Sequence, residues 1–290
     1  EESLQINSSD YFNYINEQAL ASASVAQVHE AELRNGEKVV LKILRPKIDK
    51  VVSSDIEILK DIARVVSKNI PEIAEIQPLQ LIKFFERTIH NELNLIQEAA
   101  NIERFRNHFK DDETLHIPQV YHHLTNSKIL CLEYIHGFKI TDKEALEFNE
   151  IDIRDVTQRG VKVYFKMVYE HGFFHADPHP GNLLVLPNRK LCFLDFGMMG
   201  SILPGDKQLL HDLLLYFLRK DIPKIIHILE KLSENKTFER RRELEYDIYD
   251  LIQEVNSLMK QFDDMRKMMK TMNKMGGGKK GLAALGNLGR

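Results

Sequence analysis

Hydrophobic and polar residues alternate over 25–31 (VAQVHEA), which is the pattern of a β-strand with one buried face. The dipeptide Asn35-Gly36 signals a two-residue hairpin turn, and the run 38–44 (KVVLKIL) is the expected return strand. Pro46 ends this strand, because proline has no backbone N–H to donate. Further strands are predicted over 117–121, 128–135, 183–186 and 191–194.

Helical periodicity dominates much of the remaining chain. Apolar residues recur along one face of 78–108, and this run is long enough for more than one helix. Residues 1–18 are polar and irregular, and we expect at most an incoming helix there. Further helices are predicted over 49–68, 152–171, 205–233 and 239–275, and the glycines at 276–278 are expected to begin a flexible tail.

The order of these elements predicts an α+β protein with two lobes. Residues 1–135 are expected to form a small lobe with an antiparallel sheet and helices, and residues 136–252 a mainly helical lobe. Residues 253–290 form a third region, a basic, methionine-rich helix with a Gly/Lys tail. A cleft between two lobes is a common place for a ligand.

Composition narrows the class of protein. With 290 residues, 43% hydrophobic and 29% charged, the chain is typical of a globular protein and not of a disordered, collagen-like or coiled-coil chain. No run of 18 apolar residues predicts a transmembrane helix. Cys131 and Cys192 lie in apolar runs, which indicates buried, reduced thiols rather than a disulfide framework or a four-cysteine zinc site.

These features predict a cytoplasmic protein, either free or held peripherally on the inner face of a membrane. The chain shows no signal peptide, and because it starts at Glu1 we expect a segment of something longer. The net charge of −3 is uneven: residues 260–290 carry eight Lys or Arg against two Asp.

The segment 175–182 (HADPHPGN) carries the most chemical information. It contains Asp177 and Asn182, and Asp195 follows in an Asp-Phe-Gly triplet. Lys42 lies near the end of a predicted strand, downstream of a small-residue loop. Phosphoryl transfer from a nucleotide needs these parts: a lysine for the phosphates, oxygen ligands for a divalent metal, and an aspartate that orients the attacking hydroxyl or water. Each part alone is a weak signal, and their joint order and spacing indicate the function.

Several segments together resemble the UbiB (aarF) family of atypical protein-kinase-like ATPases. The resemblance covers about residues 10–252 and implies a two-lobed protein-kinase-like fold. The matching segments are ASASVAQVH at 21–29, VVLKILRP at 39–46, ELNLIQEAANIERF at 92–105, LCLEYIHG at 130–137, GFFHADPHPGN at 172–182 and LDFGMMG at 194–200.

The resemblance implies a role for each matched residue in binding ATP and Mg²⁺. Lys42 would contact the nucleotide phosphates and pair with Glu98, and Glu92 falls on the first position of the family's Glu-x-Asp motif. Glu133 and Tyr134 would form the hinge that binds adenine. The implied catalytic-loop residue is Asp177, the implied metal ligands are Asn182 and Asp195, and the implied alanine-rich nucleotide loop is Ala21, Ser22, Ala23 and Ser24.

The alanine-rich loop stands where kinases carry glycines. Alanine and serine restrict the backbone and present Cβ atoms to the nucleotide, so that binding should differ from that in a typical kinase. In the family this loop goes with weak or absent protein phosphorylation and with ATPase-like activity that supports ubiquinone biosynthesis or related lipid metabolism. The implied partners are ATP, ADP, an isoprenoid lipid or quinone precursor, and a membrane surface.

Two departures from the family pattern stand out. The Lys-x-Gly-Gln motif expected upstream of the alanine-rich loop is absent from the sequence. The Glu-x-Asp motif reads Glu92-Leu93-Asn94, so the second acidic charge is missing. His175 and His179 flank Asp177, and the resemblance favours orientation of the loop over metal binding for both.

Residues 253–290 resemble the C-terminal end of the methionine-rich domain of the signal recognition particle protein. Phe262, Met265, Met269 and Met272 would form one apolar helix stripe among lysines. The RNA-contacting Arg-Gly-Ser-Gly turn of that family is missing, so neither RNA nor signal-peptide binding is expected. Two alternatives remain for residues 253–290. They form a helix that packs on the large lobe of the same chain, or they are a fusion artefact.

Two other functions remain open. The pattern His175-x-Asp177-x-His179-x-x-Asn182 also resembles small-molecule kinases of the aminoglycoside and choline kinase type, although the alanine-rich loop and the EAAN segment argue against them. A nucleotide-gated protein that binds an apolar lipid and turns over little ATP is the third hypothesis, favoured by the basic, methionine-rich tail.

Overall fold

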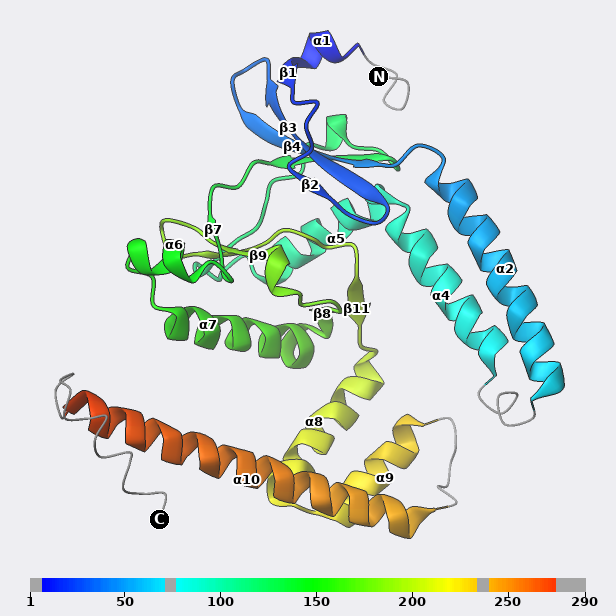
Figure 1. Ribbon diagram of the computed structural model, residues 1–290, viewed down its shortest axis with the longest axis vertical. Helices are drawn as coiled ribbons and strands as arrows, with labels where there is room; N and C mark the ends of the chain where they lie inside the picture. Colours follow the sequence, from blue (N-terminus) through cyan, green and yellow to red (C-terminus); the bar gives the residue numbers. More distant parts are fainter. Residues whose placement is uncertain (1–6, 71–76, 234–239, 275–290) are drawn as a thin grey trace, which may run out of the picture. The chain divides into compact units, whose positions relative to one another are not determined.

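The computed structural model describes residues 7–70, 77–233 and 240–274 (Figure 1). The chain divides into two compact units, Glu1–Ile202 and Leu203–Arg290. This division falls inside the predicted helical lobe 136–252, and the three predicted regions stay a prediction. Each unit is described by itself below.

A five-stranded antiparallel sheet forms the first part of the larger unit and confirms the predicted antiparallel sheet. Its order is β1-β3-β4-β6, and β2 also pairs with β3. The predicted hairpin is present: its turn contains Gly36 with φ +86°, in the left-handed region that glycine tolerates. The strands are β1 (Phe12–Ile15), β2 (Ala21–Ser22), β3 (Ala26–Leu33), β4 (Lys38–Leu44) and β6 (Ile129–Glu133).

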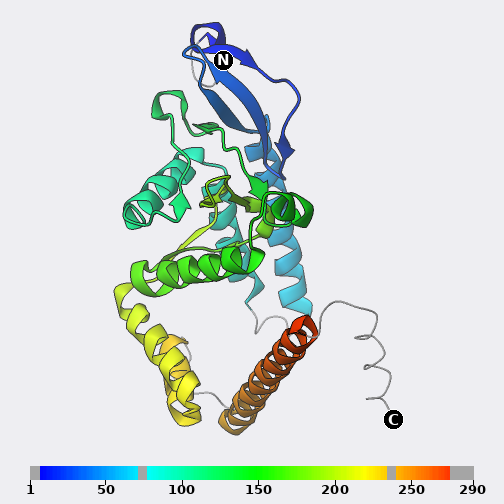
Figure 2. The same ribbon diagram turned by 90° about the vertical axis from the view of Figure 1, so that its left-hand side faces the viewer.

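Three helices follow β4 in sequence: α2 (Ile48–Asn69), α4 (Pro78–Glu92) and α5 (Leu95–His108). Helices α2 and α4 lie side by side in both views (Figures 1 and 2). The predicted helical run 78–108 is two helices, because Leu93 ends α4 and the Asn94 side chain accepts a hydrogen bond from Ile96 N to cap α5.

The rest of the larger unit consists of helices and short strands, several of them within residues 172–201. A helix α7 (Ile153–Phe165) continues as a π-helical turn η2 (Lys166–His171) up to Gly172. A four-stranded sheet has the order β5-β10-β9-β7, and β8 pairs with β11. The remaining elements are α1 (Ser8–Tyr11), β5 (Leu115–His116), η1 (His122–Leu124), β7 (Phe138–Lys139), α6 (Lys143–Phe148), β8 (Phe173–His175), η3 (Pro180–Asn182), β9 (Leu183–Val185), β10 (Leu191–Phe193) and β11 (Met199–Ser201).

Phe105 of α5 lies at the centre of the main hydrophobic core of this unit. Its ring contacts those of Phe109, Phe193 and Phe196, at centroid distances of 4.6, 5.7 and 5.2 Å. Helix α5, strand β10 and the Asp-Phe-Gly segment are therefore held by one aromatic cluster. Burial of such large side chains gives aromatic clusters a dominant share of core energetics.

The smaller unit contains α8 (Pro204–Arg219), α9 (Ile222–Leu232) and α10 (Arg241–Lys274). Ile225 and Ile226 of α9 pack with Ile248 and Ile252 of α10. The methionine-rich stripe at Phe262, Met265, Met269 and Met272 lies on α10, but these side chains lie outside the described ones. Among the described residues, no helix is long and apolar enough to cross a membrane.

Three of the predicted segments differ from the structure. The strand predicted over 117–121 is wrong: Pro118 lacks an N–H, and Val120 makes a single bridge to Leu132. The helix predicted over 205–233 is two helices, because Lys220 has a left-handed φ of +59° and Asp221 caps α9. Residues 12–15 form β1, whereas an irregular segment was predicted.

His108 at the end of α5 carries a prediction about pH. Its ring stacks on His171 at a centroid distance of 4.7 Å, and its buried Nδ1 has no hydrogen-bond partner among the described residues. Burial, His171 and Arg104 lower the pKa of His108. The unfolded chain therefore binds the proton more readily, and the free energy of unfolding should fall as the pH drops below about 6.5.

The variant His108→Phe keeps an aromatic ring at this position and removes the titration. Urea unfolding at pH 7.5 and 5.5 should show a smaller loss of stability for the variant than for the wild type. An equal loss in both proteins would contradict this account of His108.

Candidate nucleotide and metal site

A buried ion pair joins the β-sheet to helix α5. Lys42 projects from β4, and its Nζ lies 2.8 Å from both carboxylate oxygens of Glu98 on α5. The Glu98 side chain is 3% exposed and that of Lys42 18%. The same Nζ lies 3.3 Å from Oδ1 of Asp195, so one ammonium bridges two carboxylates from distant parts of the chain.

The charges of the three groups depend on one another. Burial raises the pKa of Glu98 to about 7, against the attraction of Lys42. Both Glu98 oxygens accept from Lys42, as those of an ionised carboxylate do. Burial also opposes the charge of Asp195, but Lys42 and the Gly197 N–H outweigh it and lower the pKa of Asp195. The ammonium therefore favours the charged form of both carboxylates, and it fully offsets the effect of burial only at Asp195.

The Asp-Phe-Gly segment is anchored to α5 by its backbone. Phe196 N donates to Oε1 of Glu98 at 3.3 Å, and Phe196 O accepts from the Asn101 side chain at 2.8 Å. Oδ1 of Asp195 accepts from Gly197 N at 2.9 Å. These bonds fix the Asp195 carboxylate next to Lys42. Asn101 lies in the EAAN segment, but no pattern in the sequence indicated its contact with Phe196.

His175 links the segment 175–182 to the Asp-Phe-Gly segment. Its Nδ1 accepts from Asp177 N at 3.2 Å, so its Nε2 carries the proton and donates to Asp195 O at 2.6 Å. His179 Nδ1 accepts from Gly181 N at 3.0 Å in the same way. Both histidines thus bind backbone groups of the loop, which supports orientation rather than metal binding.

Most of the predicted site residues line one cavity of about 180 Å³. Lys42, Asp177, Asn182 and Asp195 meet there, together with the second half of the alanine-rich loop. The lining residues are Ala23, Ser24, Val25, Ala26, Lys42, Glu92, Glu98, His175, Asp177, Asn182, Asp195, Gly197 and Met198.

Four predicted site residues do not line this cavity. Ala21 and Ser22 form strand β2, which pairs with β3. Glu133 ends β6, and its carboxylate binds His116 Nε2 at 3.0 Å. Tyr134 donates its N–H to Lys38 O.

Arg45 holds the alanine-rich loop in place. Its Nη2 donates to Ser22 Oγ at 2.7 Å and to Ala23 O at 3.1 Å. Sequence reasoning missed this residue, although it lies in the matched segment 39–46, because no periodic pattern links two positions more than 20 residues apart. Arg45 thus further restricts a loop whose alanine and serine residues already allow fewer backbone conformations than glycine would.

Glu92 and Asn94 occupy the altered Glu-x-Asp motif. Glu92 lines the cavity, and burial together with Asp195 raises its pKa. Asn94 instead caps α5, with its Oδ1 3.2 Å from Ile96 N. Asparagine and aspartate are equally good N-caps, so the missing charge does not impair this local role.

The cavity suits a magnesium ion that enters with a phosphate ligand. Asn182 and Asp195 supply hard oxygen donors, and Lys42 beside them supplies positive charge for phosphates. In the described part of the chain, no three His, Cys, Asp or Glu side chains are grouped to hold a metal by themselves. Mg²⁺ commonly takes one or two carboxylates and completes its shell with phosphate oxygens and water, so this donor set fits.

Comparison with known proteins identifies the class to which this fold and site belong. The family model described as "ABC1 atypical kinase-like domain" matches residues 1–229, and the chain belongs to this family. The predicted α+β, kinase-like fold is thereby confirmed.

Within the family the chain is a UbiB homologue. It is 37% identical to "Probable protein kinase UbiB" of Cellvibrio japonicus over 79% of this chain and 42% of that protein. The protein of the same name from Aliivibrio fischeri is 38% identical over 76% and 41%. The chain thus spans about two fifths of the length of these relatives.

The fold is similar to that of solved structures, one of which is described here. Its title is "The complex structure of Rv3197-erythromycin from Mycobacterium tuberculosis", and it matches with a TM-score of 0.62 and 21% identity. The match covers 87% of this chain and 63% of that one.

The ion pair predicts a specific pattern of stability. In Lys42→Met, the buried Glu98 carboxylate loses its partner. The free energy of unfolding should therefore fall by about 3 kcal/mol. Stability of this variant should fall further from pH 5 to pH 8, because Glu98 keeps its proton in the fold and releases it on unfolding. Urea unfolding of Lys42→Met, Glu98→Met and the double variant measures the interaction free energy between the two side chains. Additive losses in the double variant would contradict the ion pair.

Asn94 offers a simpler prediction. Asn94→Ala removes the cap of α5 and should cost about 1 kcal/mol, whereas Asn94→Asp should leave the free energy of unfolding almost unchanged. Thermal or urea unfolding checks both variants. A loss in Asn94→Asp as large as that in Asn94→Ala would show that capping is not the role of this side chain.

Proposed function

We propose that this chain binds Mg-ATP and transfers or hydrolyses its γ-phosphoryl group. One observation carries the proposal: Lys42, paired with Glu98 and Asp195, lies in the same cavity as Asp177 and Asn182. Together they supply the charges and oxygen donors that phosphoryl transfer requires. Family membership supports the same chemistry.

Each side chain has a separate task in this proposal. Lys42 binds the phosphates, and Glu98 keeps its ammonium in position. Asn182 and Asp195 hold Mg²⁺, which neutralises charge on the phosphates when it is bound. Asp177 accepts the proton of the attacking hydroxyl or water. His175 positions Asp177 and Asp195, because its two nitrogens bind the backbone of both.

The nucleotide is held differently from that of a typical kinase. Ala23 and Ser24 line the cavity, and Arg45 restricts their loop. This arrangement favours ATPase-like turnover over protein phosphorylation. Adenine is assigned to the end of β6, but not to the N–H groups of Glu133 and Tyr134, which donate to Gln119 O and Lys38 O. The UbiB relatives further suggest a role in ubiquinone or isoprenoid-lipid metabolism, at a membrane surface.

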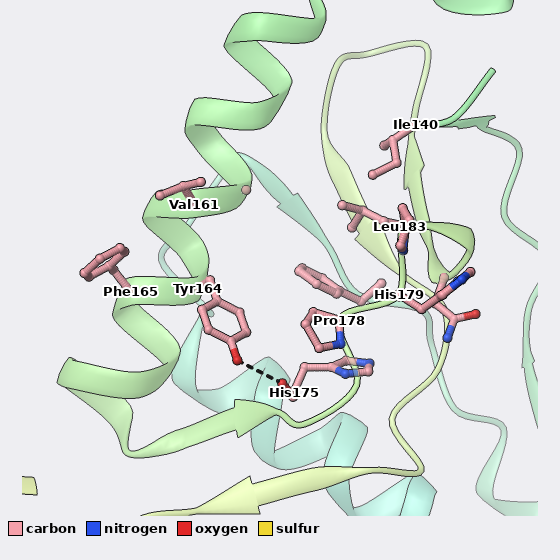
Figure 3. Close-up of a pocket in the computed structure, with 12 residues that line it drawn as sticks. Ile140, Val161, Tyr164, Phe165, His175, Pro178, His179 and Leu183 are labelled. Carbon is pink, nitrogen blue, oxygen red and sulfur yellow. Dashed lines mark hydrogen bonds between the residues drawn. The ribbon is translucent and has the colours of Figure 1, made fainter. Parts of the chain in front are cut away.

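A second candidate is a nucleotide-gated protein that binds an apolar ligand and turns over little ATP. It is favoured by a larger, apolar cavity next to the segment 175–182 (Figure 3), which shares His175 and Asn182 with the cavity of Lys42. A neighbour of similar fold was solved with erythromycin, and that complex describes the other protein alone. ATP binding without hydrolysis would distinguish this candidate from the first.

The substitution Asp195→Asn tests the first proposal. It keeps the shape of the side chain and removes the charge that faces the metal, so Mg-ATP turnover should fall at least 100-fold, about 2.7 kcal/mol of transition-state stabilisation. Release of inorganic phosphate measures turnover. The matched control is Asp250→Asn, at an exposed aspartate on α10, which should behave as the wild type. Retained turnover in Asp195→Asn would refute the proposed role.

A further inference from the structure

Helix α10 carries large apolar residues at alternating spacings of four and three residues along almost its whole length. The spacing continues over four heptads, which is the pattern of a helix that pairs lengthwise with another helix. Because seven residues make about two helical turns, these residues form one heptad stripe on the helix. In order they are Leu244, Ile248, Leu251, Val255, Leu258, Phe262, Met265, Met269 and Met272.

Within its own unit, only the first part of the heptad stripe is covered. Helix α9 has 11 residues, whereas α10 has 34. Leu244, Ile248 and Ile252 of α10 belong to the hydrophobic cluster with α9, and no described residue of α10 after Ile252 belongs to it (Figure 1). The shorter helix therefore leaves most of the stripe without a partner in this unit.

The described side chains next to this cluster and just beyond it are open to water. Leu251 is 51% exposed, Val255 38% and Leu258 57%. Met259 beside them is 61% exposed. Four large apolar side chains that adjoin on one helix differ from apolar residues scattered singly over a surface, and such a patch marks an interaction surface.

The charges of α10 indicate which partner fits this surface. Residues 243–254 contain five Asp or Glu and no Lys or Arg, whereas residues 260–274 contain five Lys or Arg against two Asp. The residues between these two halves are uncharged. Two copies of the helix that run in opposite directions therefore place the acidic half of each beside the basic half of the other. A parallel pair would place like charges side by side, which is unfavourable.

A membrane surface fits α10 less well than a second copy does. Anionic lipids attract the basic half of the helix, but they repel the acidic half. An antiparallel copy satisfies both halves and also removes the apolar stripe from water.

We propose that α10 is a dimerisation helix, which pairs in the antiparallel direction with α10 of a second copy of this chain through the heptad stripe from Leu251 onward. Leu258 lies near the middle of this contact, and each copy contributes it. The match to the family model ends at residue 229, so this surface lies outside the part of the chain that the family defines. The inference goes beyond the proposed function and does not require nucleotide binding.

The first test measures the mass of the full chain in solution by sedimentation equilibrium. The wild type should be a dimer that dissociates on dilution. Leu258→Gln keeps a good helix former and removes the apolar side chain from both copies, so the dimer should become at least tenfold weaker.

The matched control is Tyr246→Gln on the same helix. Tyr246 is 71% exposed, but it lies two residues from Ile248 and therefore points to the opposite side of the helix. This variant also exchanges an exposed apolar side chain for glutamine, and its dissociation constant should stay within twofold of that of the wild type. Circular dichroism shows whether each variant is folded.

Spin labels determine the direction of the two helices. Cys131 and Cys192 are buried, and burial raises the pKa of both thiols to about 12, so a label attaches to a single introduced cysteine. In an antiparallel pair, labels at Lys260→Cys lie close together. Labels at Glu243→Cys then lie roughly 45 Å apart, since a helix rises about 1.5 Å per residue.

Three results would overturn the proposal. A folded wild type that stays monomeric is one, as expected if the stripe packs on the larger unit of the same chain. Equal dimerisation of the wild type and folded Leu258→Gln is another. Short distances between labels at both positions would contradict the antiparallel direction. Stabilisation by Mg-ATP should be the same in the wild type and Leu258→Gln, so failure of the nucleotide proposal is seen separately.

Discussion

The charge of Lys42 is the constraint on which the rest of the site depends. It lies between Glu98 and Asp195, two carboxylates that burial alone would drive toward the protonated form. Without the ammonium, α5 and the Asp-Phe-Gly segment would each lose their ionic contact with the sheet. A buried charge of this kind is costly, and its retention is consistent with a site that must bind an anion.

The contacts around this ion pair join helix α5 and two loops into one structure. Phe196 ties the Asp-Phe-Gly segment to α5 through Glu98 and Asn101, and His175 ties that segment to the loop of Asp177. The buried Phe196 ring joins the aromatic cluster around Phe105. The positions of the proposed catalytic groups are therefore set by the core, as the proposed catalysis by orientation would require. The polar and the apolar cavity then share the two loop residues that face both.

Local patterns predicted the long elements well. Strand β4 and helices α2 and α5 follow from alternation and helical periodicity, and the pairing of Lys42 with Glu98 came from the family resemblance rather than from any spacing. Short strands such as β2 and β8 were missed because two or three residues are too few to show an alternating pattern. The helix break at Lys220 is signalled by Asp221 and Pro223, an N-cap residue and a proline in the first turn of α9, and the single helix predicted over 205–233 overlooked them. The anchoring of the loop by Arg45 is a tertiary contact without a sequence signal.

The central claim is that Lys42 and its two carboxylates form a site for a nucleotide with its metal. The most direct test is isothermal titration of the wild-type chain with ATP, first with Mg²⁺ and then with EDTA, beside Lys42→Met. The account predicts saturable binding that needs Mg²⁺ and that weakens at least tenfold in a folded Lys42→Met protein. Binding of equal strength in Lys42→Met, or no binding by the folded wild type, would contradict it.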